Sequence, residues 1–297
     1  MSKTAFIFPG QGSQAVGMGK DLIEQSPKAK EIFEQANQAL GFDLTKLCLE
    51  GPEEELKQTA NTQPAILTTS IAQWKILEAE NKSPEIVAGH SLGEYSALVA
   101  AGVIDFVDAV KLVRLRGKLM EEAVPDGKGT MAAILGLTHK QIADVLSKLN
   151  GVAEIANINC PGQIVISGGT PAIKEACAQL AEAGAKRAVM LSVSGPFHSS
   201  LMQPAGAKLK AEIDKINFNV PKFKFIANVT ADYASDPKQI KELLVKQVSS
   251  SVLWQQTVER MLNEGINEFV EVGPGNVLMG LLKKIQKEKV KSVVNGQ

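Results

Sequence analysis

The chain has 297 residues, of which 44% are hydrophobic and 22% are charged. This composition is typical of a globular protein with one large domain or two modest ones, and it excludes a disordered or fibrous chain. The 32 basic and 32 acidic residues give a formal net charge of zero. No global field therefore attracts nucleic acid or an anionic membrane surface, and we expect neither as a partner.

The cysteines and the apolar segments exclude further classes. Cys48, Cys160 and Cys177 lie far apart and show no Cys-x-x-Cys or Cys/His ligand spacing. We therefore expect no disulfide framework and no metal site. No apolar stretch approaches the ~20 residues that span a bilayer, and the short N-terminal apolar run ends at Pro9-Gly10. We expect a cytoplasmic protein without a targeting segment.

The first part of the chain alternates apolar strands with helices. Strands are predicted at 4–8 and 86–88, and helical periodicity predicts helices over about 92–101 and 105–123. Strands separated by helices are typical of a parallel sheet.

The order of elements changes in the middle of the chain. The pattern there predicts two helices among four strands, in the order strand 130–135, helix 138–149, strand 153–159, strand 163–168, helix 171–183 and strand 188–193. This βαββαβ order is typical of a ferredoxin-like fold. Turn-forming residues at 125–129 and 194–196 mark its two ends.

The α/β alternation then resumes, with strands predicted at 223–227, 268–272 and 292–294 and helices near 237–248, 253–264 and 276–287. The sequence therefore predicts an α/β fold with a parallel sheet, formed by residues 1–127 and 195–297. A small ferredoxin-like subdomain, residues 128–194, is inserted into it, and we expect a cleft between the two.

A Gly-His-Ser-Leu-Gly pentapeptide, residues 89–93, lies where the second predicted strand meets a helix. A GxSxG sequence in that context forms a sharp turn that presents the serine hydroxyl at the edge of the sheet. The adjoining helix N-terminus favours the negative charge that develops on an attacked carbonyl. Ser91 is thus a candidate nucleophile. The alternative is that Ser91 only caps the helix.

A nucleophilic serine needs a base, and the chain has only three histidines. His90 adjoins Ser91, and neighbours at a sharp elbow point in different directions, which favours a packed or hydrogen-bonded turn residue. His139 begins a predicted helix and is expected at the surface. By elimination His198, where the inserted segment returns to the large domain, is the candidate base. No aspartate partner is evident, so an amide or a backbone carbonyl could orient it.

Arg116 lies on the apolar stripe of the helix predicted over 105–123, whereas Arg114 falls on the opposite side among charged residues. A buried arginine is costly unless it is paired. Arg116 could form a structural salt bridge with an internal carboxylate. Alternatively, its guanidinium could bind a substrate carboxylate in a bidentate manner. We expect Arg114 to be an ordinary solvated residue.

The segment 10–15, Gly-Gln-Gly-Ser-Gln-Ala, fits the loose dinucleotide-binding pattern. No second strand ending in an acidic residue follows at the required distance, because Glu31 and Glu34 lie within an evident helix. We therefore interpret the segment as a turn whose N–H groups face the catalytic pocket.

Five motifs together resemble a known family over nearly the whole chain: FPGQGSQ at 8–14, GHSLGEY at 89–95, RLRGKLM at 114–120, GPFHS at 195–199 and EVGPGNVL at 271–278. In order and spacing they are similar to those of malonyl-CoA:acyl carrier protein transacylases. The resemblance implies an α/β-hydrolase-like core with a ferredoxin-like insertion. It also implies transfer of malonyl from malonyl-CoA to the phosphopantetheine thiol of acyl carrier protein, for fatty acid or polyketide synthesis.

The resemblance implies a role for each matching residue. Ser91 would be acylated, with His198 as the base. The other implied assignments are the N–H groups of Gln11 and Leu92 as an oxyanion hole, Arg116 as the partner of the malonyl carboxylate, Gln247 as the residue whose carbonyl orients His198, and Phe197 as selective for malonyl over bulkier acyl groups. No cofactor is implied, because the CoA thioester is itself a substrate.

Two other functions use the same residues differently. A serine thioesterase or esterase would share Ser91 and His198 but would release a free acid, and it would have no particular use for Arg116. A non-catalytic scaffold would usually lose one of these three residues, and all are present here. We expect a discrete, monomeric enzyme.

Overall fold

The computed structural model describes residues 3–294, with side chains as far as residue 288. Its main sheet has five strands in the order β8-β7-β2-β1-β9. The inner strand β1 (Thr4–Phe8) runs parallel to its two neighbours, β2 (Ile86–Gly89) and β9 (Glu268–Glu271). β7 (Lys224–Ala227) is parallel to β2, and the short β8 (Asp232–Tyr233) is antiparallel to β7 at the edge. The predicted parallel sheet is confirmed.

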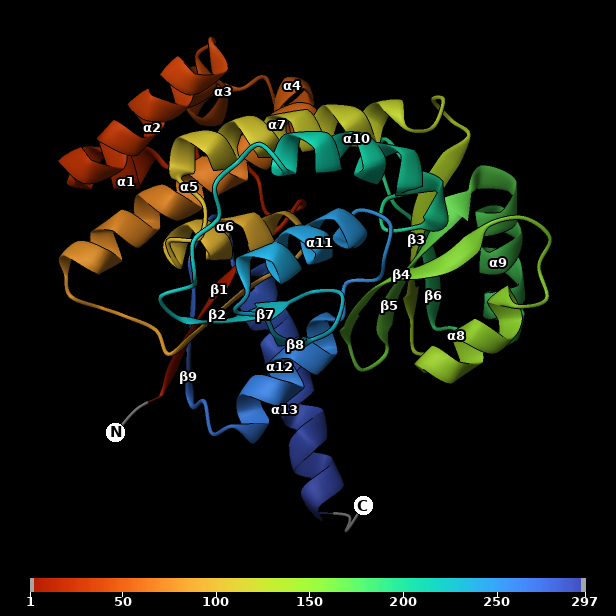
Figure 1. The fold of residues 1–297 in the computed structure, drawn as a ribbon. Coiled ribbons are helices and arrows are strands. Elements are labelled where there is room, and N and C mark those ends of the chain that lie inside the picture. Colours follow the sequence, from red (N-terminus) through yellow and green to blue (C-terminus); the bar gives the residue numbers. More distant parts are fainter. Residues whose placement is uncertain (1–2, 295–297) are drawn as a thin grey trace.

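Helices cover both faces of the main sheet (Figure 1). Successive side chains of a strand point to opposite faces, so Phe6 and Phe8 pack on one face and Ala5 and Ile7 on the other. The first face is covered chiefly by α5 (Thr59–Ala79), α6 (Leu92–Ala100) and α7 (Phe106–Glu122). The second is covered by α12 (Trp254–Asn263) and α13 (Val277–Val294).

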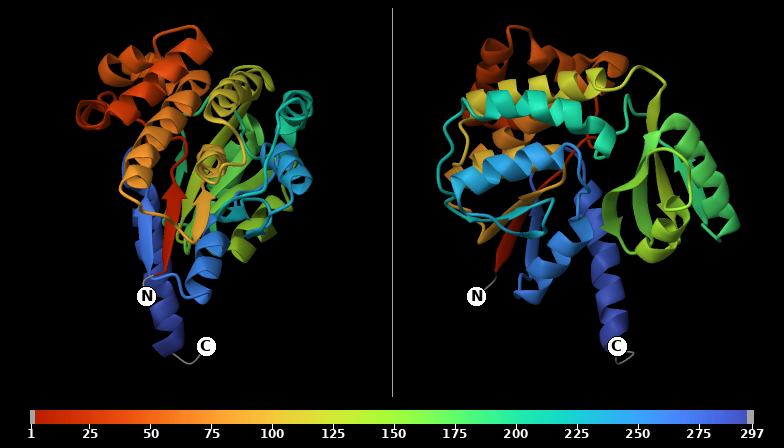
Figure 2. Two further views of the ribbon diagram at one scale, coloured as in Figure 1. Left: turned by 60° about the vertical axis from the view of Figure 1, so that its left-hand side comes forward. Right: turned by 45° about the vertical axis from the view of Figure 1, so that its right-hand side comes forward.

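A second, antiparallel sheet lies beside the first (Figure 2) and is here termed the small sheet. Its strand order is β4-β5-β3-β6. The helices α8 and α9 pack on one face of it, and the opposite face adds Met131, Ala156 and Val165 to the larger core. The bounds are β3 Gly129–Leu135, α8 His139–Leu146, β4 Ala153–Cys160, β5 Gln163–Gly169, α9 Thr170–Glu182 and β6 Arg187–Met190.

The remaining helices pack chiefly on α5, on α7 and on one another. They are α1 Lys20–Gln25, α2 Pro27–Leu40, α3 Leu44–Glu50, α4 Glu53–Lys57, the 3₁₀ turn η1 Ser200–Met202, α10 Gln203–Ile213 and α11 Pro237–Gln247.

Hydrogen bonds join β4 of the small sheet to the start of η1 and to the loop between α11 and α12. The Val252 N–H donates to the Ala156 carbonyl at 2.8 Å, and the Ile158 N–H donates to the Val252 carbonyl at 2.9 Å. The Glu154 carboxylate accepts from both the backbone N–H and the hydroxyl of Ser200, each at 2.7 Å. The two sheets are thus tied together at residues 200 and 252.

One predicted strand is wrong. Residues 292–294 form the last turn of α13. The apolar residues Leu278, Leu281, Leu282 and Ile285 recur at helical spacing and are buried against the main sheet. The helix that they establish continues through the short apolar run at its end, which by itself has no distinguishing period.

Candidate active site

Ser91 lies in a strained turn between β2 and α6. Its φ and ψ are 51° and −105°, and a non-glycine residue with positive φ is held there by its surroundings. Neither glycine of the pentapeptide, Gly89 or Gly93, has room for a side chain. A Cβ on Gly89 would lie 1.9 Å from the Gly93 carbonyl oxygen, and one on Gly93 would lie 2.0 Å from the Phe8 carbonyl oxygen.

Asn228, which follows β7 directly, holds this turn from behind. Its Oδ1 accepts from the Ser91 N–H at 2.7 Å, and its Nδ2 donates to the Gly89 carbonyl at 2.6 Å. The side chain is completely buried. Sequence reasoning missed Asn228. The available signal was its position just after a parallel strand, where side chains from several strands meet at one edge.

The structure brings Ser91 and His198 together. Ser91 Oγ lies 2.7 Å from His198 Nε2, and His198 Nδ1 donates to the Gln247 backbone carbonyl at 2.8 Å. Since the carbonyl can only accept, Nε2 is the nitrogen left to take the serine proton. Burial, and secondly the Arg116 cation, lower the pKa of His198 to about 3. The imidazole is therefore neutral at neutral pH and available as a base.

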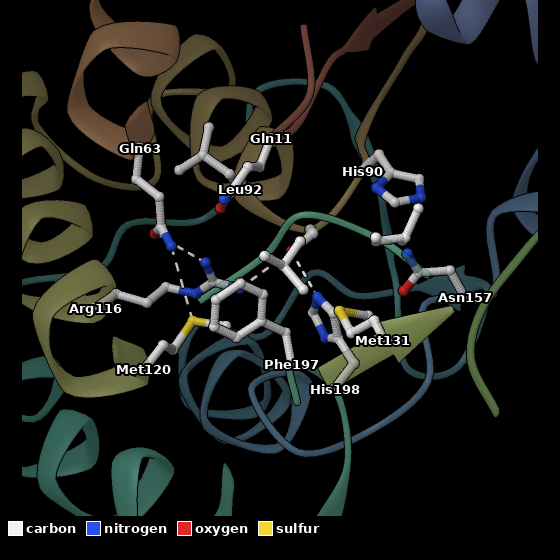
Figure 3. A pocket seen from close by; sticks show the side chains of 13 residues that line it. Gln11, Gln63, His90, Leu92, Arg116, Met120, Met131, Asn157, Phe197 and His198 are labelled. Carbon is white, nitrogen blue, oxygen red and sulfur yellow. Dashed lines mark hydrogen bonds between the residues drawn. The ribbon is translucent and has the colours of Figure 1, made fainter. Parts of the chain in front are cut away.

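Arg116 is 1% exposed and extends from α7 to Ser91. Figure 3 shows its guanidinium beside Gln63. Nη1 donates to Gln63 Oε1 at 2.8 Å, and Nη2 donates to Gln247 Oε1 at 2.9 Å and to Ser91 Oγ at 3.2 Å. Nε has no partner among the described residues. No carboxylate in the described part of the chain forms a salt bridge with Arg116, so the alternative of a direct structural ion pair is wrong.

The side chain of Gln247 connects several of these groups. Its Nε2 donates to the Ser91 carbonyl at 2.8 Å and to Glu94 Oε2 at 2.6 Å. Glu94 is 1% exposed, and burial raises its pKa to about 7 against the opposing effects of Gln247, the Asn228 N–H and Arg116. Sequence reasoning found Gln247 only through the family resemblance and did not single out Glu94 or Gln63.

Two residues that line the same cavity, Gln11 and Leu92, have backbone N–H groups without an acceptor among the described residues. Gln11 lies in the turn after β1, and Leu92 is the first residue of α6. Both residues line the cavity at Ser91, so their free N–H groups are available to an oxyanion there.

The cavity at Ser91 has a volume of about 110 Å³. It is lined by residues of the loops that follow the strands of the main sheet, by Gln63, Arg116 and Met120 of α5 and α7, and by Met131 and Asn157 of the small sheet. In Figure 3, Met131 lies beside His198, and Asn157 lies beside His90. Phe197, which is 5% exposed, and Met120 complete an apolar portion of its wall. The cavity therefore combines an apolar wall with the buried cation of Arg116.

The other two histidines lie as predicted. His90 Nε2 is 2.9 Å from Asn159 Oδ1, and its ring packs edge-on against Trp254, which agrees with a hydrogen-bonded turn residue. His139 is exposed at the start of α8.

The expectation for Arg114 was wrong. It is half-buried, donates to the Ala60 carbonyl at 2.8 Å and to Asn61 Oδ1, and stacks over the Phe42 ring. The residues packed around α7, including Ala60 and Asn61 of α5, cover part of the polar face of this helix as well as its apolar stripe.

Among the described residues, no three His, Cys, Asp or Glu side chains gather in a way that could hold a metal ion. Within the same part of the chain, every helix is too short or too polar to cross a membrane.

Residues 5–295 match the family model described as "Acyl transferase domain". The chain is 49% identical to the malonyl CoA-acyl carrier protein transacylase of Bacillus subtilis, over 97% of this chain and 92% of that one. An acyl carrier protein S-malonyltransferase from Vibrio cholerae superposes with a TM-score of 0.95 at 48% identity, covering 96% of this chain and 94% of that chain. A malonyl-transacylase in complex with its type II PKS acyl-carrier protein superposes with a TM-score of 0.94 at 45% identity, covering 96% of this chain and 94% of that chain.

Proposed function

The chain belongs to the acyl transferase domain family, and we propose that it moves a malonyl group from malonyl-CoA to the phosphopantetheine thiol of an acyl carrier protein. One observation carries this proposal. A buried arginine lies 3.2 Å from the hydroxyl of a serine that is itself 2.7 Å from a neutral histidine. A hydrolase acting on neutral esters needs the serine and the histidine but has no use for the buried cation.

In the first half of the reaction, His198 Nε2 takes the proton of Ser91 Oγ as the oxygen attacks the thioester carbonyl. The oxygen of the tetrahedral intermediate accepts from the N–H groups of Gln11 and Leu92. The intermediate collapses, the C–S bond breaks, and the CoA sulfur leaves with the proton from His198. Malonyl remains as an ester on Ser91.

The second half reverses these steps with a different thiol. His198 takes the proton of the carrier's phosphopantetheine thiol, and the sulfur attacks the malonyl ester. The C–O bond then breaks, and His198 returns the proton to Ser91 Oγ. Throughout, the Gln247 carbonyl keeps the Nδ1 proton of His198 in place, and Arg116 pairs with the free carboxylate of the malonyl group. The product supplies fatty acid or polyketide synthesis.

The finer architecture and selectivity belong to the same proposal. The order β4-β5-β3-β6 with two helices on one face supports a ferredoxin-like subdomain over 128–194. The strained serine after β2 supports an α/β-hydrolase-like core from 1–127 and 195–297. Phe197 in the cavity wall supports its assignment as the residue that crowds bulkier acyl groups. Neither a metal nor a redox cofactor enters these steps.

The test is the intact mass of the protein after brief incubation with malonyl-CoA, beside acetyl-CoA, with Ser91→Ala as the matched variant. We expect a malonyl adduct on the wild type, formed in preference to acetyl, that moves to a phosphopantetheinylated carrier protein when it is added. Ser91→Ala should form no adduct. Free malonate and CoA without an adduct would indicate a hydrolase, and near-normal transfer by Ser91→Ala would remove the nucleophile.

A further inference from the structure

Glu94 is a buried acid that the reaction steps above do not use. It lies in the first turn of α6, three residues after the nucleophile, and is 1% exposed. Its carboxylate accepts from Gln247 Nε2 at 2.6 Å and from the Asn228 N–H at 3.4 Å. Within the described part of the chain it forms no salt bridge. A buried carboxylate without an ion pair is costly, so its retention in this place needs an explanation.

The Gln247 amide links this carboxylate to Arg116. The two Nε2 protons go to the Ser91 carbonyl and to Glu94, and Oε1 accepts from Arg116 Nη2. The opposite orientation of the amide would set Oε1 against two oxygens and Nε2 against a guanidinium donor. Glu94 and the Ser91 carbonyl therefore fix the direction of the amide, and the amide in turn presents an acceptor to Arg116.

We propose that Glu94 is a positioning residue. Acting through the Gln247 amide, its carboxylate holds the Arg116 guanidinium beside Ser91 and balances the arginine charge from one residue away. This inference rests on the proposed malonyl transfer, because it concerns the group that receives the acyl carboxylate.

The indirect arrangement has a chemical advantage over a direct ion pair. A carboxylate in contact with Arg116 would compete with the substrate carboxylate for the same donors. Because the Gln247 amide lies between Glu94 and Arg116, the Glu94 carboxylate does not contact the guanidinium directly. Among the described residues, Arg116 Nε then stays without a partner, and Nη1 donates one of its two protons, to Gln63. Charge is balanced while donors remain for the acyl group.

The variant Glu94→Gln keeps the shape of the side chain and removes its charge. It also sets an NH₂ group against one of two donors, the Gln247 amide or the Asn228 N–H. At pH 8 we expect kcat/KM for malonyl-CoA to fall, and the malonyl-to-acetyl ratio of kcat/KM to fall at least about fivefold, the scale of coupling between groups in one network. Glu122→Gln, an exposed site on α7, is the matched control and should leave the ratio unchanged.

A double-mutant cycle with Arg116→Ala separates this role from a purely structural one. If Glu94 acts through Arg116, then Glu94→Gln should change malonyl transfer by less than about twofold once the arginine is gone. Equal losses for malonyl and acetyl, or full effects of Glu94→Gln in both backgrounds, would overturn the inference. Circular dichroism checks folding. If Glu94→Gln does not fold, Glu94→Asp, which keeps the charge but shortens the reach to Gln247, takes its place in the same cycle.

The wild-type arm distinguishes the two proposals. A wild type that transfers no malonyl overturns the proposed function and this inference together. A wild type that transfers malonyl, with an unchanged acyl ratio in the variants, overturns only the role of Glu94.

Discussion

Arg116→Ala tests the charge at the centre of the site. The substitution removes a fully buried guanidinium that donates to Gln63, Gln247 and Ser91. A malonyl group bound in the cavity would then present its carboxylate to a pocket without a cation. Removing one partner from a buried, hydrogen-bonded charge pair costs about 2 to 5 kcal/mol. At about 1.4 kcal/mol per tenfold, malonyl-CoA kcat/KM should fall about 30-fold to 5,000-fold.

An acetyl group has no carboxylate to lose a partner, so its transfer should fall about tenfold or less, through the lost contact with Ser91 Oγ. Removing the arginine also raises the pKa of His198. Burial is the larger cause of the lowered pKa, so His198 stays mostly neutral at pH 8 and can still act as a base.

The assay is a competition. The protein receives equal concentrations of malonyl-CoA and acetyl-CoA, and intact mass at early times gives the ratio of the two adducts. Arg114→Ala is the matched control, since it lies on the same helix and has its own hydrogen bonds to Ala60 and Asn61. It should cost stability without changing the ratio. Equal losses of both adducts in Arg116→Ala would refute the pairing of this arginine with the acyl carboxylate.

Three further outcomes follow from burial and backbone geometry. Because the pKa of His198 is lowered to about 3, the rate of acetyl-adduct formation by Glu94→Gln, in which the buried carboxyl no longer titrates, should show no inflection near the ordinary histidine pKa of about 6.5; such an inflection, measured by intact mass, would mean that the base is solvated. The pKa of Glu94 is raised from 4.5 to about 7, so its stabilising contribution is complete below pH 4.5 and is lost as the pH rises to about 7. Urea denaturation should therefore show that the wild type loses about 3 kcal/mol of unfolding free energy relative to Glu94→Gln between pH 4.5 and 8. A difference that stays constant over this range would contradict the raised pKa. Thermal melting should show Gly93→Ala destabilised by several kcal/mol or unfolded, because its Cβ would meet the Phe8 carbonyl. The control Gly280→Ala in α13, with nothing within 4 Å of its Cβ, should gain about 0.5 to 1 kcal/mol of stability. A stable Gly93→Ala would show that the turn at Ser91 can relax.

The sequence predicted the parts of the site that have a local signature. Ser91 was evident because its turn needs glycine at fixed positions between a strand and a helix. Arg116 was evident because a charge on an apolar stripe interrupts a helical period. His198 was reached by elimination among three histidines and through the family resemblance, and no pattern in the sequence gave its distance to Ser91.

The residues that were missed have no local signature. Asn228 and Glu94 are ordinary polar residues until the parallel strands align their carboxyl ends and bring 91, 94, 228 and 247 within hydrogen-bond distance. Gln63 lies in α5, which is buried along most of its length. A helix enclosed on all sides has no contrast between faces, so no period marks the residue that points into the cavity.

The ties between β4 and the loops at residues 200 and 252 have a mechanical consequence. His198 lies two residues before one tie, and Gln247 lies five residues before the other. Ser91, by contrast, is anchored to the main sheet. A swing of the small sheet away from the main sheet would therefore strain the segments that carry His198 and Gln247, which are themselves hydrogen-bonded to Ser91. The width of the cavity is thus coupled to the Ser91–His198 geometry. Under the proposed function, we expect a larger acyl group to enter after replacement of wall side chains such as Phe197 or Met131, rather than by movement of the small sheet.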